Sequence, residues 1–148
     1  MKDIRIAVIG AGMAGLTAAL SLQKNGFKPV VYELAPQLGE VGAGLTLSPN
    51  STHGLEYVGL ADELKKRANI PASQAIMHYQ TGEVLVETKR GEIPYEKYGA
   101  YYYQIHRADL HDMLSAAATA KDPDCLVLDH AFSSCVETDD GIEITFTN

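Results

Sequence analysis

Cysteine is scarce in this sequence. The only two cysteines, Cys125 and Cys135, form neither a CxxC pair nor the dense framework that small secreted domains use. The sequence therefore does not predict a disulfide-stabilised scaffold, and the expected setting is the reducing cytoplasm.

Basic residues are also few, and no apolar run is long. Twelve Lys and Arg stand against nineteen Asp and Glu, giving a formal net charge of -7, and the only basic run, Lys65–Arg67, lies beside Asp62 and Glu63. Because binding to a phosphate backbone depends on clustered Lys and Arg, this balance argues against a nucleic-acid partner. The apolar run Ile4–Ile9 is too short for a signal or membrane helix, so a soluble chain without a membrane partner is expected.

What is present is an ordinary globular composition, with 46% hydrophobic and 21% charged residues over 148 positions. This length fits one compact domain and leaves no room for a second full domain. The chain stops at Asn148 directly after a predicted strand, which suggests a truncated fragment whose open sheet edges would favour homo-oligomers.

The start of the chain has the pattern of a βαβ unit. The nearly continuous apolar run Ile4–Ile9 is typical of a strand in a parallel sheet that is covered on both faces. Apolar residues at helical spacing predict a helix over Met13–Asn25, and Val30–Tyr32 predicts a second strand. This order predicts an α/β fold of the Rossmann-like, doubly wound type with a parallel sheet.

The rest of the chain is predicted to alternate between helices and antiparallel strands. Ser48 and Pro49 are expected to begin a helix, as its N-cap and first position. Strand-like alternation over Gln74–Ile105 predicts a β-rich excursion. Three further segments are predicted from such patterns: a helix at 106–119, a buried strand at 126–128 and a β-hairpin at 132–146.

The strongest motif is the glycine-rich turn between the first predicted strand and helix. Gly10, Gly12 and Gly15 form a GxGxxG pattern, whose glycines permit a tight turn, close approach of a pyrophosphate and close helix packing, in that order. Glu33, at the end of the second strand, is placed to accept hydrogen bonds from ribose hydroxyls and would repel the 2′-phosphate of NADP. The motif predicts a dinucleotide site in which NAD and FAD are equally acceptable.

Two later segments favour FAD over NAD, because they resemble segments of a known family. GAGLTLSPN at Gly42–Asn50 and HRADL at His106–Leu110 follow the glycine motif in an order that resembles the FAD-dependent aromatic-ring hydroxylases, in the salicylate hydroxylase and 6-hydroxynicotinate monooxygenase branch of the flavoprotein monooxygenases. The resemblance spans essentially the whole chain. It implies that residues 1–148 are an FAD-binding domain, the amino-terminal portion of a larger monooxygenase, with the substrate-binding sheet and the family's DG and GD motifs absent.

The resemblance also implies which residues contact FAD. Those of the βαβ unit would hold the ADP half, Gly44–Thr46 would pass near the flavin, Arg107 would reach the phosphates or ribityl chain, and the backbone of Phe132 would meet the adenine. A guanidinium suits phosphate oxygens on physical grounds as well. Some relatives carry a histidine at the position of Thr46, so this residue is either substrate-facing or a plain loop threonine. The full set is Gly10, Gly12, Ala14, Gly15, Glu33, Leu34, Gly44, Leu45, Thr46, Arg107 and Phe132.

For the parent enzyme, the resemblance implies an NAD(P)H-dependent monooxygenase that hydroxylates a phenolic or hydroxypyridine carboxylate. In that family NAD(P)H reduces the flavin, O2 adds at the flavin C4a, and the hydroperoxide hydroxylates the ring, while the protein orients the cofactor. No catalytic side chain is predicted within this chain. An NAD-dependent dehydrogenase or flavin reductase, and a truncated non-catalytic nucleotide-binding module, stay open as alternatives.

Two other groups of residues invite a functional interpretation. His106 and His111, with nearby Asp109 and Asp112, resemble metal ligands, but a spacing of five does not place both histidines on one helical face. A solvated helix start is expected there. The tyrosines at 101–103 are expected on both faces of a strand, because the chain lacks the basic surface that base stacking would accompany.

Overall fold

The computed structural model describes residues 4–39 and 42–147. The chain divides into two compact units, one formed by Met1–Val41 with Leu110–Asn148 and the other by Gly42–Asp109. Among the described residues, none of the helices combines the length and the apolar character that a membrane crossing requires.

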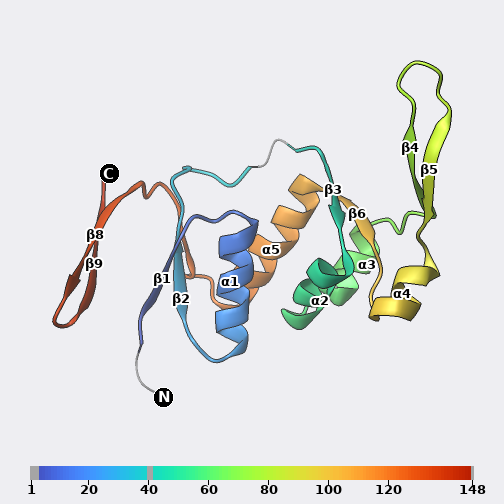
Figure 1. Ribbon diagram of the computed structural model, residues 1–148. Coiled ribbons are helices and arrows are strands. Elements are labelled where there is room, and N and C mark those ends of the chain that lie inside the picture. Colours follow the sequence, from blue (N-terminus) through green and yellow to red (C-terminus); the bar gives the residue numbers. More distant parts are fainter. Residues whose placement is uncertain (1–3, 40–41, 148) are drawn as a thin grey trace. The chain divides into compact units, whose positions relative to one another are not determined.

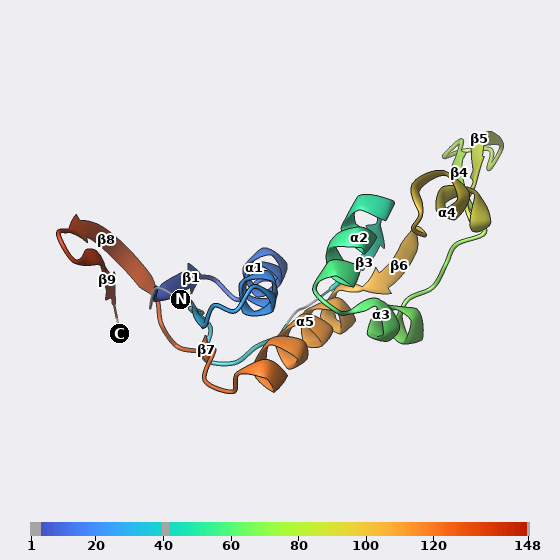
Figure 2. The ribbon, with the colours of Figure 1, turned by 90° about the horizontal axis from the view of Figure 1, so that it is seen from below.

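The first unit is built on a parallel sheet with strand order β1-β2-β7. β1 (Ile6–Ile9) pairs with β2 (Pro29–Tyr32), and β2 pairs with β7 (Leu126–Val127). Helix α1 (Met13–Lys24) connects β1 to β2, and it lies on the same side of the sheet as the part of α5 (Arg107–Lys121) that belongs to this unit (Figures 1 and 2). The predicted α/β class and βαβ unit are confirmed.

The core of this unit lies between the sheet and the two helices. Helix α1 buries Leu16, Ala19 and Leu20 at the predicted spacing, and each such leucine contributes about 1.5–3 kcal/mol. The expectation that both faces of β1 are covered is wrong, because Ile9 is 46% exposed. The strand predicted at 126–128 is shorter than expected and only half-buried.

A β-hairpin lies on the other side of the sheet from α1 (Figures 1 and 2). It consists of β8 (Phe132–Thr138) and β9 (Gly141–Phe146), as the sequence predicted. The ring of Phe146 packs on that of Tyr32 in β2, with 4.7 Å between the centroids. This aromatic contact attaches the hairpin to the sheet.

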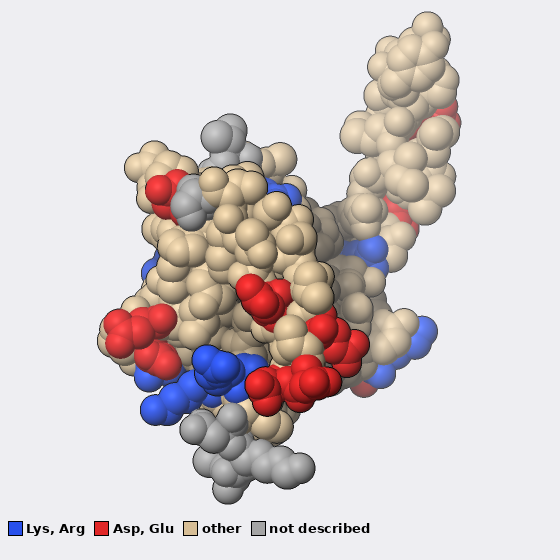
Figure 3. All heavy atoms as spheres, turned by 90° about the vertical axis from the view of Figure 1, so that its left-hand side faces the viewer, with Lys and Arg blue, Asp and Glu red and all other residues tan. Residues whose placement is uncertain are grey.

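An open groove runs between β1, β2 and this hairpin. Its walls carry the basic residues Arg5 and Lys28 together with the acidic residues Asp140 and Glu143. Figure 3 views the molecule from this side and shows basic and acidic side chains of the described residues lying close to one another.

The second unit places helices beside a two-stranded antiparallel ribbon. β3 (Gly44–Leu47) pairs with β6 (Tyr103–His106), and α2 (Pro49–Tyr57) and α3 (Ala61–Arg67) follow β3 along the chain. Ser48 is the N-cap of α2 and Pro49 its first residue, as predicted. The core is formed by residues of these elements and their connections, namely Leu47, Leu55, Val58, Leu60, Leu64, Tyr103 and Ile105.

The predicted β-rich excursion is only partly strand. β4 (Ser73–Met77) and β5 (Val84–Lys89) form a hairpin, but α4 (Glu92–Tyr98) is a helix, so the strand prediction over that stretch is wrong. Its start and end signals explain the difference: Glu92 lies in the first turn, and Gly99 is a left-handed C-cap with φ 72°. The strand prediction rested on alternation over the whole stretch Gln74–Ile105, whereas Glu92–Tyr98 itself does not alternate.

The two cysteines provide a test of this fold. Cys125 is 1% exposed, and burial, aided by the nearby Asp122 carboxylate, raises the pKa of its thiol. Cys135 is exposed on β8. Because the thiolate is the nucleophile, we expect iodoacetamide to alkylate Cys135 and to spare Cys125 in the native chain, as read by peptide mass spectrometry. Both should react in denaturant, and equal labelling of the two native thiols would contradict the fold.

Candidate functional site

The glycine turn has the geometry that its motif predicts. Gly10 has a φ of +93°, which favours glycine, and its N–H donates to Tyr32 O at 2.7 Å. A Cβ on Gly15 would collide with Gly10 O, so only glycine lets α1 approach the turn this closely. A Cβ on Gly12 would have no atom within 4 Å, which leaves open space at the position expected to meet a pyrophosphate.

Helix α1 presents uncapped N–H groups after this turn. Its N-cap residue is Gly12, which has no side chain to accept the first-turn N–H groups, and the first turn holds no acidic residue. Such a terminus carries a partial positive charge and suits an anionic group. Ala14, in this first turn, is exposed. The electrostatics at this end of α1 therefore favour a phosphate.

Glu33 is tied to the glycine turn and is not a solvated strand end. Its Oε2 accepts a hydrogen bond from the Ala11 N–H at 2.6 Å, and its Oε1 accepts one from the Ala35 N–H at 3.0 Å. An ionised carboxylate has about four lone-pair sites, so further bonds from ribose hydroxyls are available. Leu34 and Phe132, the two predicted adenosine neighbours, are exposed apolar residues of the same unit.

The buried position of His111 was not predicted from the sequence. Its side chain is 4% exposed, and its Nε2 lies 2.7 Å from Ala11 O, so the expectation of a solvated helix start is wrong for this residue. Position 111 falls on the apolar face of α5, three residues before the buried Leu114 and seven before the buried Ala118. That spacing was the available signal. In the described part of the chain, no group of three or more His, Cys, Asp or Glu side chains could hold a metal ion.

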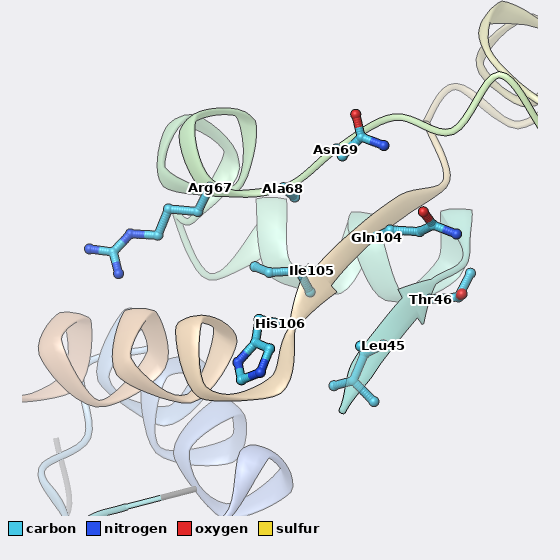
Figure 4. Close-up of a pocket in the computed structure, with 9 residues that line it drawn as sticks. Leu45, Thr46, Arg67, Ala68, Asn69, Gln104, Ile105 and His106 are labelled. Atoms are coloured by element: carbon cyan, nitrogen blue, oxygen red, sulfur yellow. The ribbon is translucent and has the colours of Figure 1, made fainter. Parts of the chain in front are cut away.

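The predicted flavin-side residues lie in the second unit and line a pocket of about 560 Å³. Thr46 of β3 pairs with Gln104 of β6, and the two side chains project to the same side of the ribbon (Figure 4). Two backbone hydrogen bonds, of 2.7 and 2.8 Å, join Gln104 of β6 to Asn69 in the segment after α3. The pocket is lined by Gly44, Leu45, Thr46, Arg67, Ala68, Asn69, Gln104, Ile105 and His106.

Arg107 begins α5 in the same unit. Its N–H donates to Ala43 O at 3.2 Å, and a Cβ on Gly42 would lie only 2.8 Å from Arg107 Cβ. The segment before β3 therefore packs closely on the start of α5, which explains the need for a glycine at position 42. The structure thus groups Gly44–Thr46 with Arg107 in one unit, and the glycine turn with Glu33, Leu34 and Phe132 in the other.

Comparison with known proteins identifies relatives over the whole described chain. The protein family described as FAD binding domain matches residues 3–148. The chain is 40% identical over 147 residues to 3-amino-4-hydroxybenzoate 2-monooxygenase of Streptomyces cremeus, covering 99% of this chain and 36% of that protein. It is 40% identical over 113 residues to 6-hydroxynicotinate 3-monooxygenase of Pseudomonas fluorescens, covering 76% and 29%.

A solved structure has the same fold. Klebsiella pneumoniae HpxO complexed with FAD and uric acid superposes with a TM-score of 0.81 at 25% identity, over 97% of this chain and 35% of that one. The chain spans about a third of the length of the relatives it matches.

The close approach at Gly15 predicts a selective loss of stability. In Gly15→Ala the new methyl group would collide with the Gly10 carbonyl, so we expect a cost of about 1–3 kcal/mol in urea unfolding followed by circular dichroism. Gly54→Ala in α2 is the control, because its Cβ enters open space and alanine favours a helix interior by about 0.5–1 kcal/mol. A Gly15→Ala chain as stable as the parent would refute the packing described for α1.

Proposed function

Because this chain belongs to the family of FAD binding domains, we propose that its glycine turn and Glu33 hold the ADP half of FAD and that the β3–β6 ribbon lies near the flavin. The observation that carries the proposal is the bond between Glu33 and the Ala11 N–H, which joins the ribose-binding carboxylate to the pyrophosphate-binding turn.

The residues present fit the chemistry of this cofactor. The pyrophosphate is anionic and suits the uncapped start of α1, beside the open space at Gly12. The ribose hydroxyls are donors that suit the remaining lone pairs of Glu33, whereas the 2′-phosphate of NADP would be repelled there. Exposed Leu34 offers apolar surface beside the adenosine, the backbone of Phe132 would meet the adenine, and Arg107 offers a guanidinium for the phosphates or ribityl chain.

We further propose that the chain is the FAD-binding domain of a larger monooxygenase that acts on an aromatic carboxylate. Support comes from the names of the relatives, which specify an aminohydroxybenzoate and a hydroxynicotinate as substrates. The flavin, reduced by NAD(P)H, supplies the activation of O2 and the transfer of one oxygen atom to the ring. The residues of this chain bind and orient the cofactor, and Thr46 and Gln104 present polar side chains in the pocket of the second unit.

Titration with FAD tests the proposal. Flavin absorbance of the purified chain, or saturable binding of added FAD, should weaken by roughly tenfold or more in Glu33→Ala, because hydrogen bonds to a charged group are lost. Gly12→Val should also weaken binding while folding normally, since the new side chain enters open space that the pyrophosphate would occupy. Glu137→Ala, at an exposed position on β8, is the matched control and should bind as the parent does.

Two outcomes would contradict the proposal. A folded chain that binds NAD but not FAD would favour a dehydrogenase. FAD binding that is unchanged in both Gly12→Val and Glu33→Ala would place the cofactor away from the glycine turn.

A further inference from the structure

His111 is a buried histidine whose imidazole contacts the glycine turn. Its Nε2 lies 2.7 Å from Ala11 O, and the side chain is almost completely buried. A carbonyl oxygen only accepts hydrogen bonds, so Nε2 carries the proton and donates it. The imidazole is therefore a fixed donor beneath the glycine turn, contributed by a helix a hundred residues away along the chain.

Both polar backbone groups of Ala11 are therefore hydrogen-bonded to side chains. Glu33 accepts its N–H, and His111 donates to its carbonyl oxygen. That carbonyl belongs to the peptide unit that also contains the N–H of Gly12. In a planar trans peptide the two bonds point in opposite directions, so fixing the Ala11 oxygen also fixes the direction of the Gly12 N–H. Within the described part of the chain, this N–H donates no hydrogen bond.

We propose that His111 is a positioning residue that aims the Gly12 N–H at the diphosphate of the bound dinucleotide. This inference rests on the proposed FAD function and adds to it a buried residue that would act through the backbone of the glycine turn. A donor that is already oriented binds an anion without first losing conformational freedom, so the histidine should raise affinity through the turn.

A packing role alone would not require histidine. An apolar residue of similar size would fill the same space without burying polar nitrogens, so the imidazole is explained by the bond that it donates. Gln can place an amide N–H near the position of Nε2, whereas Leu fills the space and leaves Ala11 O buried without a donor. These two substitutions separate the hydrogen bond from the packing.

FAD titration of the full chain provides the test, with thermal unfolding measured in parallel. His111→Leu should raise the Kd for FAD roughly tenfold, the effect of one lost hydrogen bond. His111→Gln should stay within about threefold of the parent, because the donor is restored. Leu114→Ala, on the same buried face of α5, should lower Tm and leave the Kd unchanged, since Leu114 is not bonded to the turn.

The amide resonance of Gly12 gives a readout that needs no cofactor. In ¹⁵N-labelled chain, it should shift in His111→Leu and stay near its parent position in Leu114→Ala. An unshifted resonance in His111→Leu would overturn the inference, as would an unchanged Kd, or a Kd that rises equally in Leu114→Ala. If the parent chain binds no FAD, the proposed function fails, and the resonance still decides whether His111 orients the Gly12 N–H.

Discussion

The parallel pairing of β1 with β2 is the constraint on which the site depends. Its register sets Ile9 opposite Tyr32, so the residues that follow, Gly10 and Glu33, leave the sheet side by side. The Gly10 N–H extends the pairing by donating to Tyr32 O, and the next N–H, that of Ala11, reaches the Glu33 carboxylate. The turn and the carboxylate thus occupy fixed positions before any ligand arrives, because the sheet has already determined where both begin.

The partial charge at this turn is opposite in sign to the net charge of the whole chain. A formal net charge of -7 would repel an anionic cofactor, yet the first turn of α1 has no acidic residue and no capping side chain. The N–H groups there carry partial positive charge. Their attraction for a bound anion acts over a short distance, where solvent and salt screen it least. The carboxylate of Glu33 is directed toward the Ala11 N–H, which offsets part of its charge by a charge-assisted hydrogen bond. The proposed site would therefore attract an anion mainly through backbone groups rather than through an excess of Lys and Arg.

Sequence patterns predicted the parts of this structure that local rules determine. The helix after the glycine motif, the start of α2 at Ser48 and the terminal hairpin all follow from spacing, capping and turn residues, and each is present. The helix α4 was missed because it is short and lies within a longer stretch of strand-like alternation, although its own residues do not alternate. The contact of His111 with Ala11 joins residues a hundred positions apart, and no local pattern specifies the partner of a buried donor. The exposure of Ile9 likewise depends on which elements cover the sheet, and the periodicity of a strand does not indicate these elements.

The most direct measurement of the central claim is a comparison of ADP and FAD as ligands by amide chemical shifts of the ¹⁵N-labelled chain. ADP carries the half of the cofactor that the glycine turn and Glu33 should hold. We expect ADP to shift the amides of Gly12, Met13 and Glu33, and FAD to shift these and, in addition, those of Thr46 and Gln104. Shifts confined to other parts of the chain, with the glycine turn unaffected by either ligand, would contradict it.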